Sequence, residues 1–255
     1  TERENDLLRR SQQQLETINH VAIELAATLE MSLLGDKLYQ LMSHYFDAHF
    51  ISLAVSDETF QVAEFRSIID EGESLPLFCL TYLSENSRTI QTIREQKPLV
   101  LNGQGSNLRI GNNNKAPNSQ LFLPLIQESK VIGVLSIQSV VPNRFDGEDL
   151  QLILAIAPFI TLALSNVLSH EQVHSLNTEL VHEKALIEQA QQQIQFLANH
   201  DTLTELPNRR ALEAHLEQRL TKTPDKPFSL VYIDLDGFKP VNDAHGHLMC
   251  DRVLQ

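Results

Sequence analysis

The sequence SQLFLPLIQESKVIGVLSIQS, residues 119–139, holds two apolar runs separated by the polar residues Glu128, Ser129 and Lys130. Both runs are short and rich in residues that favour strands, and the polar break between them is typical of a turn. We therefore predict a β-hairpin. The sequence FDGEDLQLILAIAPFITLAL follows, with Asp146 as a suitable N-cap and acidic residues in the first turn, and it predicts an apolar helix.

Upstream of the hairpin, short apolar runs predict further strands. HFISLAV (49–55) and FQVAEF (60–65) flank the polar turn SDET, and KPLVLN (97–102) has the composition of another strand. A helical stretch is expected to begin near Pro76. The stretch GQGSNLRIGNNNKAPNS (103–119) is rich in glycine, asparagine and serine and is predicted to be a loop.

This order of elements resembles a GAF domain, and the resemblance is carried by LFLPLIQESKVIGVLSIQS and FDGEDLQLILAIAPFITLALSNV. It implies a small antiparallel sheet with helices on one face over residues 14–168, preceded by a helix or linker over residues 1–13. It also implies a small-molecule ligand, of unknown identity, between the sheet and the loop side. The loop of residues 103–119 is either a lid over that ligand or only a solvated connection.

A second periodic segment, residues 169–197, is predicted to be a signalling helix that forms a parallel two-stranded coiled coil. Eight residues follow each other at steps of three and four, and seven of them are apolar: Val173, Leu176, Leu180, Glu183, Ile187, Ala190, Ile194 and Leu197. So narrow a stripe favours a homodimer seam over a solvated helix on a neighbouring domain. Leu8, Leu15, Ala22 and Leu29 also recur every seven residues, and they predict either a second seam or a helix packed on its own domain.

The run FSLVYIDLD, residues 228–236, is nearly all apolar until its end and predicts a buried strand. On a strand, Asp234 and Asp236 would project from the same face and repel each other. A divalent cation such as Mg²⁺, bound together with phosphates, would offset that repulsion. The alternative is a strand end with two solvated carboxylates.

The pair DTLTELPNRR (201–210) and YIDLDGFKPVNDAHGHLMCD (232–251) resembles the first half of a GGDEF domain, the diguanylate cyclase family, which we assign to residues 198–255. The resemblance implies a partial ferredoxin-like palm, and hence an α+β chain with two domains and a long helix. It also implies that two GTP molecules are joined into cyclic di-GMP with Mg²⁺ or Mn²⁺.

The resemblance further implies a role for seven residues. The metal would be bound by the Asp234 side chain and the Leu235 backbone carbonyl. The nucleotide would be bound by Asn242 and Asp251 at the guanine edge, by His247 at another substrate-contacting position, and by Phe238 and Lys239 along the base and phosphates. A carboxylate suits guanine because the base offers two adjacent N–H donors.

Two positions depart from the usual family pattern. Cys250 stands where relatives usually have glycine, next to Asp251, and Glu205 replaces a common glycine, which we expect to be harmless. The GGDEF loop would lie downstream of Gln255, so no catalytic set is complete here and the fragment alone is expected to be inactive. Two functions stay open: a GAF-regulated cyclase, or a degenerate GTP-binding module that controls a downstream phosphodiesterase domain.

The composition and charge of the chain limit its possible partners and its cellular location. A net charge of −13 and a pI of about 5.1 argue against a nucleic-acid partner. No apolar run is expected to reach the roughly 20 residues of a membrane span. The two cysteines, Cys79 and Cys250, fit a reducing compartment, so we predict a cytoplasmic protein.

Overall fold

The computed structural model describes residues 18–57, 62–81, 87–103, 116–223 and 225–255. The chain divides into two compact units, Thr1–His174 and Ser175–Gln255. The predicted N-terminal helix or linker of residues 1–13 and most of the predicted loop of residues 103–119 lie outside the described residues.

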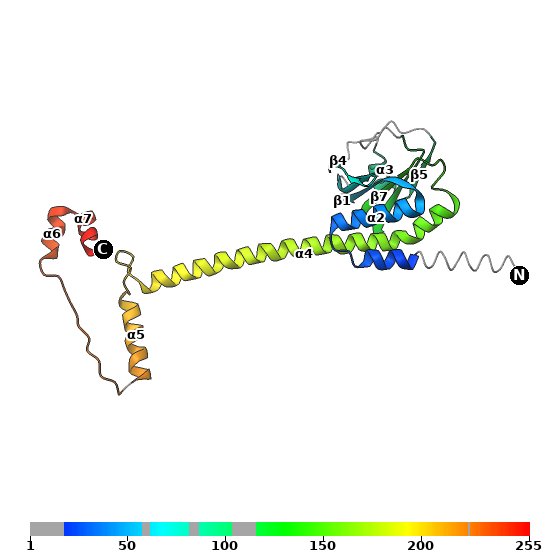
Figure 1. The fold of residues 1–255 in the computed structure, drawn as a ribbon. Helices are drawn as coiled ribbons and strands as arrows, with labels where there is room; N and C mark the ends of the chain where they lie inside the picture. Colours follow the sequence, from blue (N-terminus) through cyan, green and yellow to red (C-terminus); the bar gives the residue numbers. More distant parts are fainter. Residues whose placement is uncertain (1–17, 58–61, 82–86, 104–115, 224) are drawn as a thin grey trace. The chain divides into compact units, whose positions relative to one another are not determined.

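The first unit is built on one antiparallel sheet of seven strands (Figure 1). Its order is β3-β2-β1-β7-β6-β5, and β4 pairs with β2. The strands are β1 (Ala48–Ser56), β2 (Val62–Asp70), β3 (Glu73–Ser74), β4 (Cys79–Thr81), β5 (Leu99–Asn102), β6 (Ser119–Gln127) and β7 (Lys130–Ser139). The predicted hairpin is confirmed as β6 and β7. Glu128 and Ser129 at its turn both have positive φ, 48° and 66°, which matches the right-handed twist of the paired strands.

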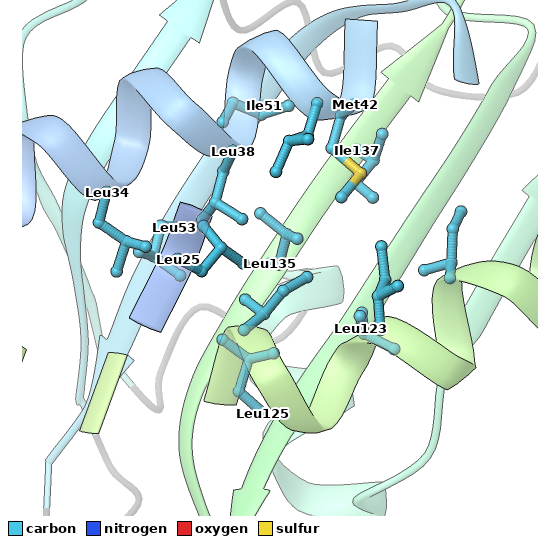
Figure 2. Packing of buried hydrophobic residues seen from close by; sticks show 14 of the residues in the cluster. Leu25, Leu34, Leu38, Met42, Ile51, Leu53, Leu123, Leu125, Leu135 and Ile137 are labelled. Carbon is cyan, nitrogen blue, oxygen red and sulfur yellow. The ribbon is translucent and has the colours of Figure 1, made fainter. Parts of the chain in front are cut away.

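Two helices cover one face of this sheet: α2 (Met31–Phe46) and the first part of α4 (Gly147–Asn199) (Figure 1). A helical segment, residues 18–26, adds Val21 and Leu25 to the same core, so this described part of the N-terminal helix packs on its own domain. Figure 2 shows the buried side chains that meet between helices and sheet: Leu25, Leu34, Leu38, Met42, Ile51, Leu53, Leu123, Leu125, Leu135 and Ile137.

A third helix, α3 (Arg88–Glu95), lies on the opposite face, so the expectation of helices on one face only is wrong. Its Ile90 and Ile93 join a second core cluster that includes Phe122 and Val134. The helix predicted from about Pro76 is wrong as well. Pro76 disfavours a helical conformation for the residue before it, and β4 follows, while α3 starts only where Ser87 Oγ accepts a hydrogen bond from the Ile90 N–H.

Two arginines tie α4 to the rest of the domain. Arg144 donates to the Tyr45 carbonyl at 2.9 Å and forms ion pairs with Asp47 and Asp149, so the end of α2 and the start of α4 share one cation. Arg66 makes a two-pronged ion pair with Glu171 of α4, with Nη2 2.9 and 2.8 Å from the two carboxylate oxygens. These contacts fix α4 at both ends of its buried stretch.

Arg66 reaches α4 because strand β2 contains a bulge. Leu53 pairs with Ser67 but Ala54 pairs with Phe65, which leaves Arg66 as the extra residue. A bulge turns the side chain of the extra residue away from the regular alternation. The ion pair with Glu171 therefore depends on one inserted residue in β2.

Helix α4 corrects the expectation that no apolar run is long enough for a membrane span. By length and composition alone it contains such a stretch. The core helix of a soluble protein passes the same test, and the residues of α4 that line the sheet core include Ile153, Ile156, Ile160 and Leu164. The cytoplasmic location stays a prediction.

Gly133 in β7 lies where strand β1 and helix α4 meet. A Cβ atom there would be 2.6 Å from the Ala54 carbonyl oxygen and 2.8 Å from Leu164 Cδ2. The backbone oxygen cannot move without breaking the strand pairing. We expect Gly133→Ala to lower the free energy of unfolding by about 2 kcal/mol in urea titration. Lys130→Ala, exposed on the same strand, should change it by less than about 0.5 kcal/mol; equal effects would contradict this packing argument.

Candidate functional site

The second unit contains a tight turn between α4 and α5 (Arg209–Lys222), built around Asp201. The Asp201 carboxylate accepts hydrogen bonds from the Thr204 N–H at 3.0 Å, the Thr204 hydroxyl at 2.9 Å and the Leu203 N–H at 3.2 Å. These bonds, the one from the Thr204 backbone first, lower the pKa of Asp201 below its ordinary value. The carboxylate is therefore ionised at neutral pH, and the turn loses these bonds only as the pH falls through that lowered pKa.

Asn208 closes the same turn from the other side. Its Oδ1 accepts from the Ala211 N–H and caps α5, while its Nδ2 donates to the Ala198 carbonyl at 3.0 Å. Its backbone N–H donates to the Asn199 carbonyl at 2.8 Å. One side chain thus satisfies the end of one helix and the start of the next.

Glu205 sits at the tip of this turn with φ = 56°. This left-handed conformation favours glycine, because a Cβ atom in it lies too close to the carbonyl oxygen that follows. The expectation that glutamate is harmless in place of glycine is therefore wrong for the backbone. The turn carries the strain, while the Glu205 N–H still donates to the Asp201 carbonyl at 2.9 Å.

We expect Glu205→Gly to relieve this strain by about 1 kcal/mol, and so to slow hydrogen exchange of the residue-205 amide about fivefold. Glu205→Ala removes the same carboxylate but keeps a Cβ atom, so it should leave the exchange rate nearly unchanged. Equal slowing in both variants would show that the carboxylate, rather than the backbone, destabilises the turn.

The predicted metal ligands lie in an extended segment and not in a strand. Residues 228–235 are assigned to no strand, and Tyr232 and Ile233 are 93% and 82% exposed, so the predicted buried strand is wrong for this structure. A strand is stable only when a neighbour takes its backbone hydrogen bonds, and no described segment of the second unit pairs with this one. Asp234 and Leu235 are consequently exposed.

The predicted nucleotide-binding residues fall on two short helices that pack on each other, α6 (Phe238–His245) and α7 (His247–Leu254). Gly246 joins the helices with φ = 79°, and its N–H donates to the Asn242 carbonyl at 2.9 Å. Helix α6 carries Phe238, Lys239 and Asn242, and helix α7 carries His247 and Asp251.

Two side chains of this helix pair, those of Cys250 and Asn242, have buried atoms. Cys250 is 2% exposed and is the buried residue of α7, so the thiol that replaces the usual glycine serves as packing. Asn242 Oδ1 is buried and has no hydrogen-bond partner among the described residues. A buried acceptor of this kind suits a ligand that brings an N–H donor.

The donor set around Asp234 suits a hard cation but does not enclose one. The Asp234 carboxylate and the Leu235 carbonyl are oxygen donors, the type that Mg²⁺ prefers, and phosphates commonly complete such a shell. In the described part of the chain, no three His, Cys, Asp or Glu side chains gather as a metal site. The structure thus places the predicted residues on adjacent elements without assembling them around a metal.

The second half of α4 exposes the side chains of the predicted seam. Leu180, Ile187 and Ile194 are 59%, 51% and 67% exposed. Each lies within one uninterrupted helix, as predicted for residues 169–197. The helix is therefore confirmed, while its pairing with a second copy stays a prediction.

The model of the GAF domain family matches residues 30–165, more than half of the chain. The chain belongs to the GAF domain family. A second family model, "Diguanylate cyclase, GGDEF domain", matches residues 198–255, so the GAF domain is followed by a GGDEF domain, as both resemblances predicted.

A solved GAF domain supports the fold of the first unit. The GAF domain of a phosphoenolpyruvate-protein phosphotransferase from Coxiella burnetii covers 62% of this chain and 96% of its own, with a TM-score of 0.51 at 12% identity. At that identity the likeness shows the fold alone.

Two curated relatives match the GGDEF end. Cyclic di-GMP phosphodiesterase PdeR of Escherichia coli is 42% identical over 66 residues, 26% of this chain and 10% of the relative. The bifunctional diguanylate cyclase/cyclic di-GMP phosphodiesterase MucR of Pseudomonas aeruginosa is 50% identical over 60 residues, 23% of this chain and 9% of the relative. The matches thus span about a tenth of the length of these relatives.

One group of residues on the sheet was missed by sequence reasoning. Gln120, Gln138, Ser52 and Ser136 are polar yet buried inside strands. The available signal was the alternation of Ser136 and Gln138 within β7, a strand whose other residues are mostly apolar; β6 and β1 contribute one member each, Gln120 and Ser52.

Proposed function

We propose that the protein is a sensor diguanylate cyclase, in which the GAF domain regulates the synthesis of cyclic di-GMP from two GTP molecules. The observation that carries this proposal is the GGDEF family match over residues 198–255, which includes both DTLTELPNRR and YIDLDGFKPVNDAHGHLMCD. The name of the MucR relative includes the same activity.

The residues of the second unit supply two parts of that chemistry. Asp234 and the Leu235 carbonyl would hold Mg²⁺ or Mn²⁺, and the metal would neutralise charge on the triphosphate when bound. Asn242 Oδ1, which has no partner among the described residues, and the Asp251 carboxylate accept hydrogen bonds from the guanine edge. Lys239 is exposed on α6 and provides a positive charge for the phosphates, beside Phe238 and His247.

The apolar stripe on α4 would bring a second chain, and with it a second GTP-binding domain, next to the first. Each GGDEF domain holds one GTP, so joining two of them requires two chains in contact. The exposed apolar stripe on residues 173–197 favours such a dimer, because a coiled coil would bury it and raise the effective concentration of the paired domains.

Cys250 favours a second candidate function, a GTP-binding GGDEF domain that regulates a phosphodiesterase domain. The buried thiol lies next to Asp251, where it leaves less room for the guanine than glycine would. The PdeR relative is named as a phosphodiesterase. Turnover of GTP separates the two candidates.

In the full-length protein, we expect Asp234→Asn to lower cyclic di-GMP production by about 100-fold, because an amide keeps the shape but loses the metal-binding charge. Asp225→Asn, on an exposed loop before the same segment, should leave it unchanged. The readout is chromatographic detection of cyclic di-GMP from GTP and Mg²⁺. If the wild-type protein binds GTP but forms no cyclic di-GMP, the cyclase proposal is wrong and the regulatory function is supported instead.

For the seam, Leu180 and Val181 form a matched pair, because they are neighbours with exposed fractions of 59% and 70% but only Leu180 lies on the stripe. We expect Leu180→Lys to weaken the dimer at least about tenfold, since two charges would be buried against each other, and Val181→Lys to leave it intact. Light scattering at micromolar concentration measures the mass. A monomeric wild-type chain would rule out the seam.

A further inference from the structure

The first half of α4 has an exposed side without any charged residue. None of the residues from Leu150 to Ser169 is charged, although Leu154 and Leu162 are 36% and 51% exposed. A helix side that faces water normally carries charged residues. One exposed leucine needs no explanation, but the absence of every charge over about five turns indicates that a partner covers this side.

The residues on this side continue the apolar stripe of residues 173–197 in the same phase. Steps of four and three, counted backwards from Val173, reach Ser169, Asn166, Leu162, Phe159 and Ala155. Of these, Ala155, Leu162 and Ser169 are exposed, and Phe159 and Asn166 are half-buried. Two helices stay in contact along a seam only while their facing residues keep one seven-residue repeat, and here that repeat continues into the GAF domain.

The contacts of α4 with its own domain use other sides of the helix. The residues that line the sheet core are Ile153, Ile156, Ile160, Ala163, Leu164 and Val167, and none of them lies on the stripe. Glu171, which holds Arg66 of β2, lies two residues from both Ser169 and Val173, so about 200° of helix rotation separates it from each. A second helix therefore fits on the stripe without displacing the sheet or the ion pair.

The chemistry of the stripe favours a second copy of this chain over a membrane surface. A helix that binds a membrane carries lysine or arginine beside its apolar side, but residues 150–169 contain neither, and the net charge of the chain is −13. In a twofold pair, each residue on the stripe meets its own counterpart. A carboxamide suits that arrangement, because Asn166 both donates to and accepts from a second asparagine.

We propose that residues 155–169 of α4 dock on the same residues of a second copy, so that the two GAF domains are paired as well as the helices that follow them. Asn166 bonds to its counterpart across the twofold axis. An asparagine at such a position costs stability but selects a parallel, in-register pair of helices. The inference rests on the proposed dimer of the cyclase and adds the surface through which the sensor domains meet.

Disulfide trapping in the full-length protein tests whether the GAF domains of two chains meet. Ala155 and Leu154 are exposed neighbours, but only Ala155 lies on the stripe. Both cysteine variants are made with Cys79→Ser, which removes the exposed native thiol. Under mild oxidation we expect at least about fivefold more linked dimer from Ala155→Cys than from Leu154→Cys, because a disulfide forms only between closely spaced backbones.

The outcomes separate this surface from the seam below it. A protein that is a dimer by light scattering but is not linked through Ala155→Cys, or is linked equally through Leu154→Cys, overturns the inference while the seam stands. Linkage that persists in Leu180→Lys supports the inference while the seam fails. A monomer that co-sediments with vesicles of anionic phospholipid overturns it in favour of a membrane surface. Neither measurement involves GTP, so the cyclase proposal is tested independently.

The role of Asn166 is tested by the dimer Kd from analytical ultracentrifugation. We expect Asn166→Val to tighten the dimer at least about tenfold, because an apolar residue replaces an amide, and Asn166→Asp to weaken it at least about tenfold, because two carboxylates would meet. Gln151→Glu, the same amide-to-acid change at an exposed residue before the stripe, should leave the Kd unchanged. An unchanged Kd in either Asn166 variant, or weakening in both, overturns the role given to Asn166.

Discussion

The pairing of β7 with β1 and β6 is the constraint on which the rest of the first unit depends. In a strand, successive side chains point to opposite faces, so the register of these three strands divides their residues into two sets. Leu135 and Ile137 go to the face of α2 and α4, and Val134 and Ser136 go to the face of α3. Once the register is set, one face presents mainly aliphatic side chains and the other presents polar side chains among apolar ones. The two faces are therefore covered by different kinds of residues.

The face of α2 and α4 is covered by aliphatic packing, and it explains why α4 docks where it does. Its buried residues repeat at helical spacing and meet the leucines of β6 and β7. Burial of a side chain such as leucine stabilises the fold by about 1.5–3 kcal/mol, so several of them hold the helix firmly. The ion pairs of Arg144 and Arg66 also fix the orientation of α4, because an ion pair has a preferred geometry that aliphatic contacts lack.

Sequence reasoning succeeded where the decisive interactions are local. The β6–β7 hairpin has its turn residues between its two strands, and each half of α4 has an apolar period of its own, so these elements could be predicted from short stretches. Sequence reasoning failed where the structure is decided by contacts between residues far apart in the chain. The amphipathic pattern of α3 shows that one side is buried but does not tell which face of the sheet receives it.

The candidate nucleotide site also contains one element that local sequence could not predict and two that it could explain. Residues 228–235 have the composition of a strand, but composition cannot provide the neighbour that takes the backbone hydrogen bonds. The helical placement of Asn242 and Asp251 follows from local glycines, with Gly237 and Gly246 both at positive φ at the helix starts. Their roles in binding rest on the family resemblance and stay predictions.

The bulge at Arg66 has a consequence for how this domain can change over evolutionary time. Residues of β2 before and after the bulge keep their faces only because one extra residue is counted there. A single-residue deletion elsewhere in the strand would move the side chains beyond it to the wrong face, whereas a deletion at Arg66 would restore regular pairing and remove the tie to Glu171. The chain length between Val62 and Asp70 is therefore expected to vary less among related domains than the residues themselves.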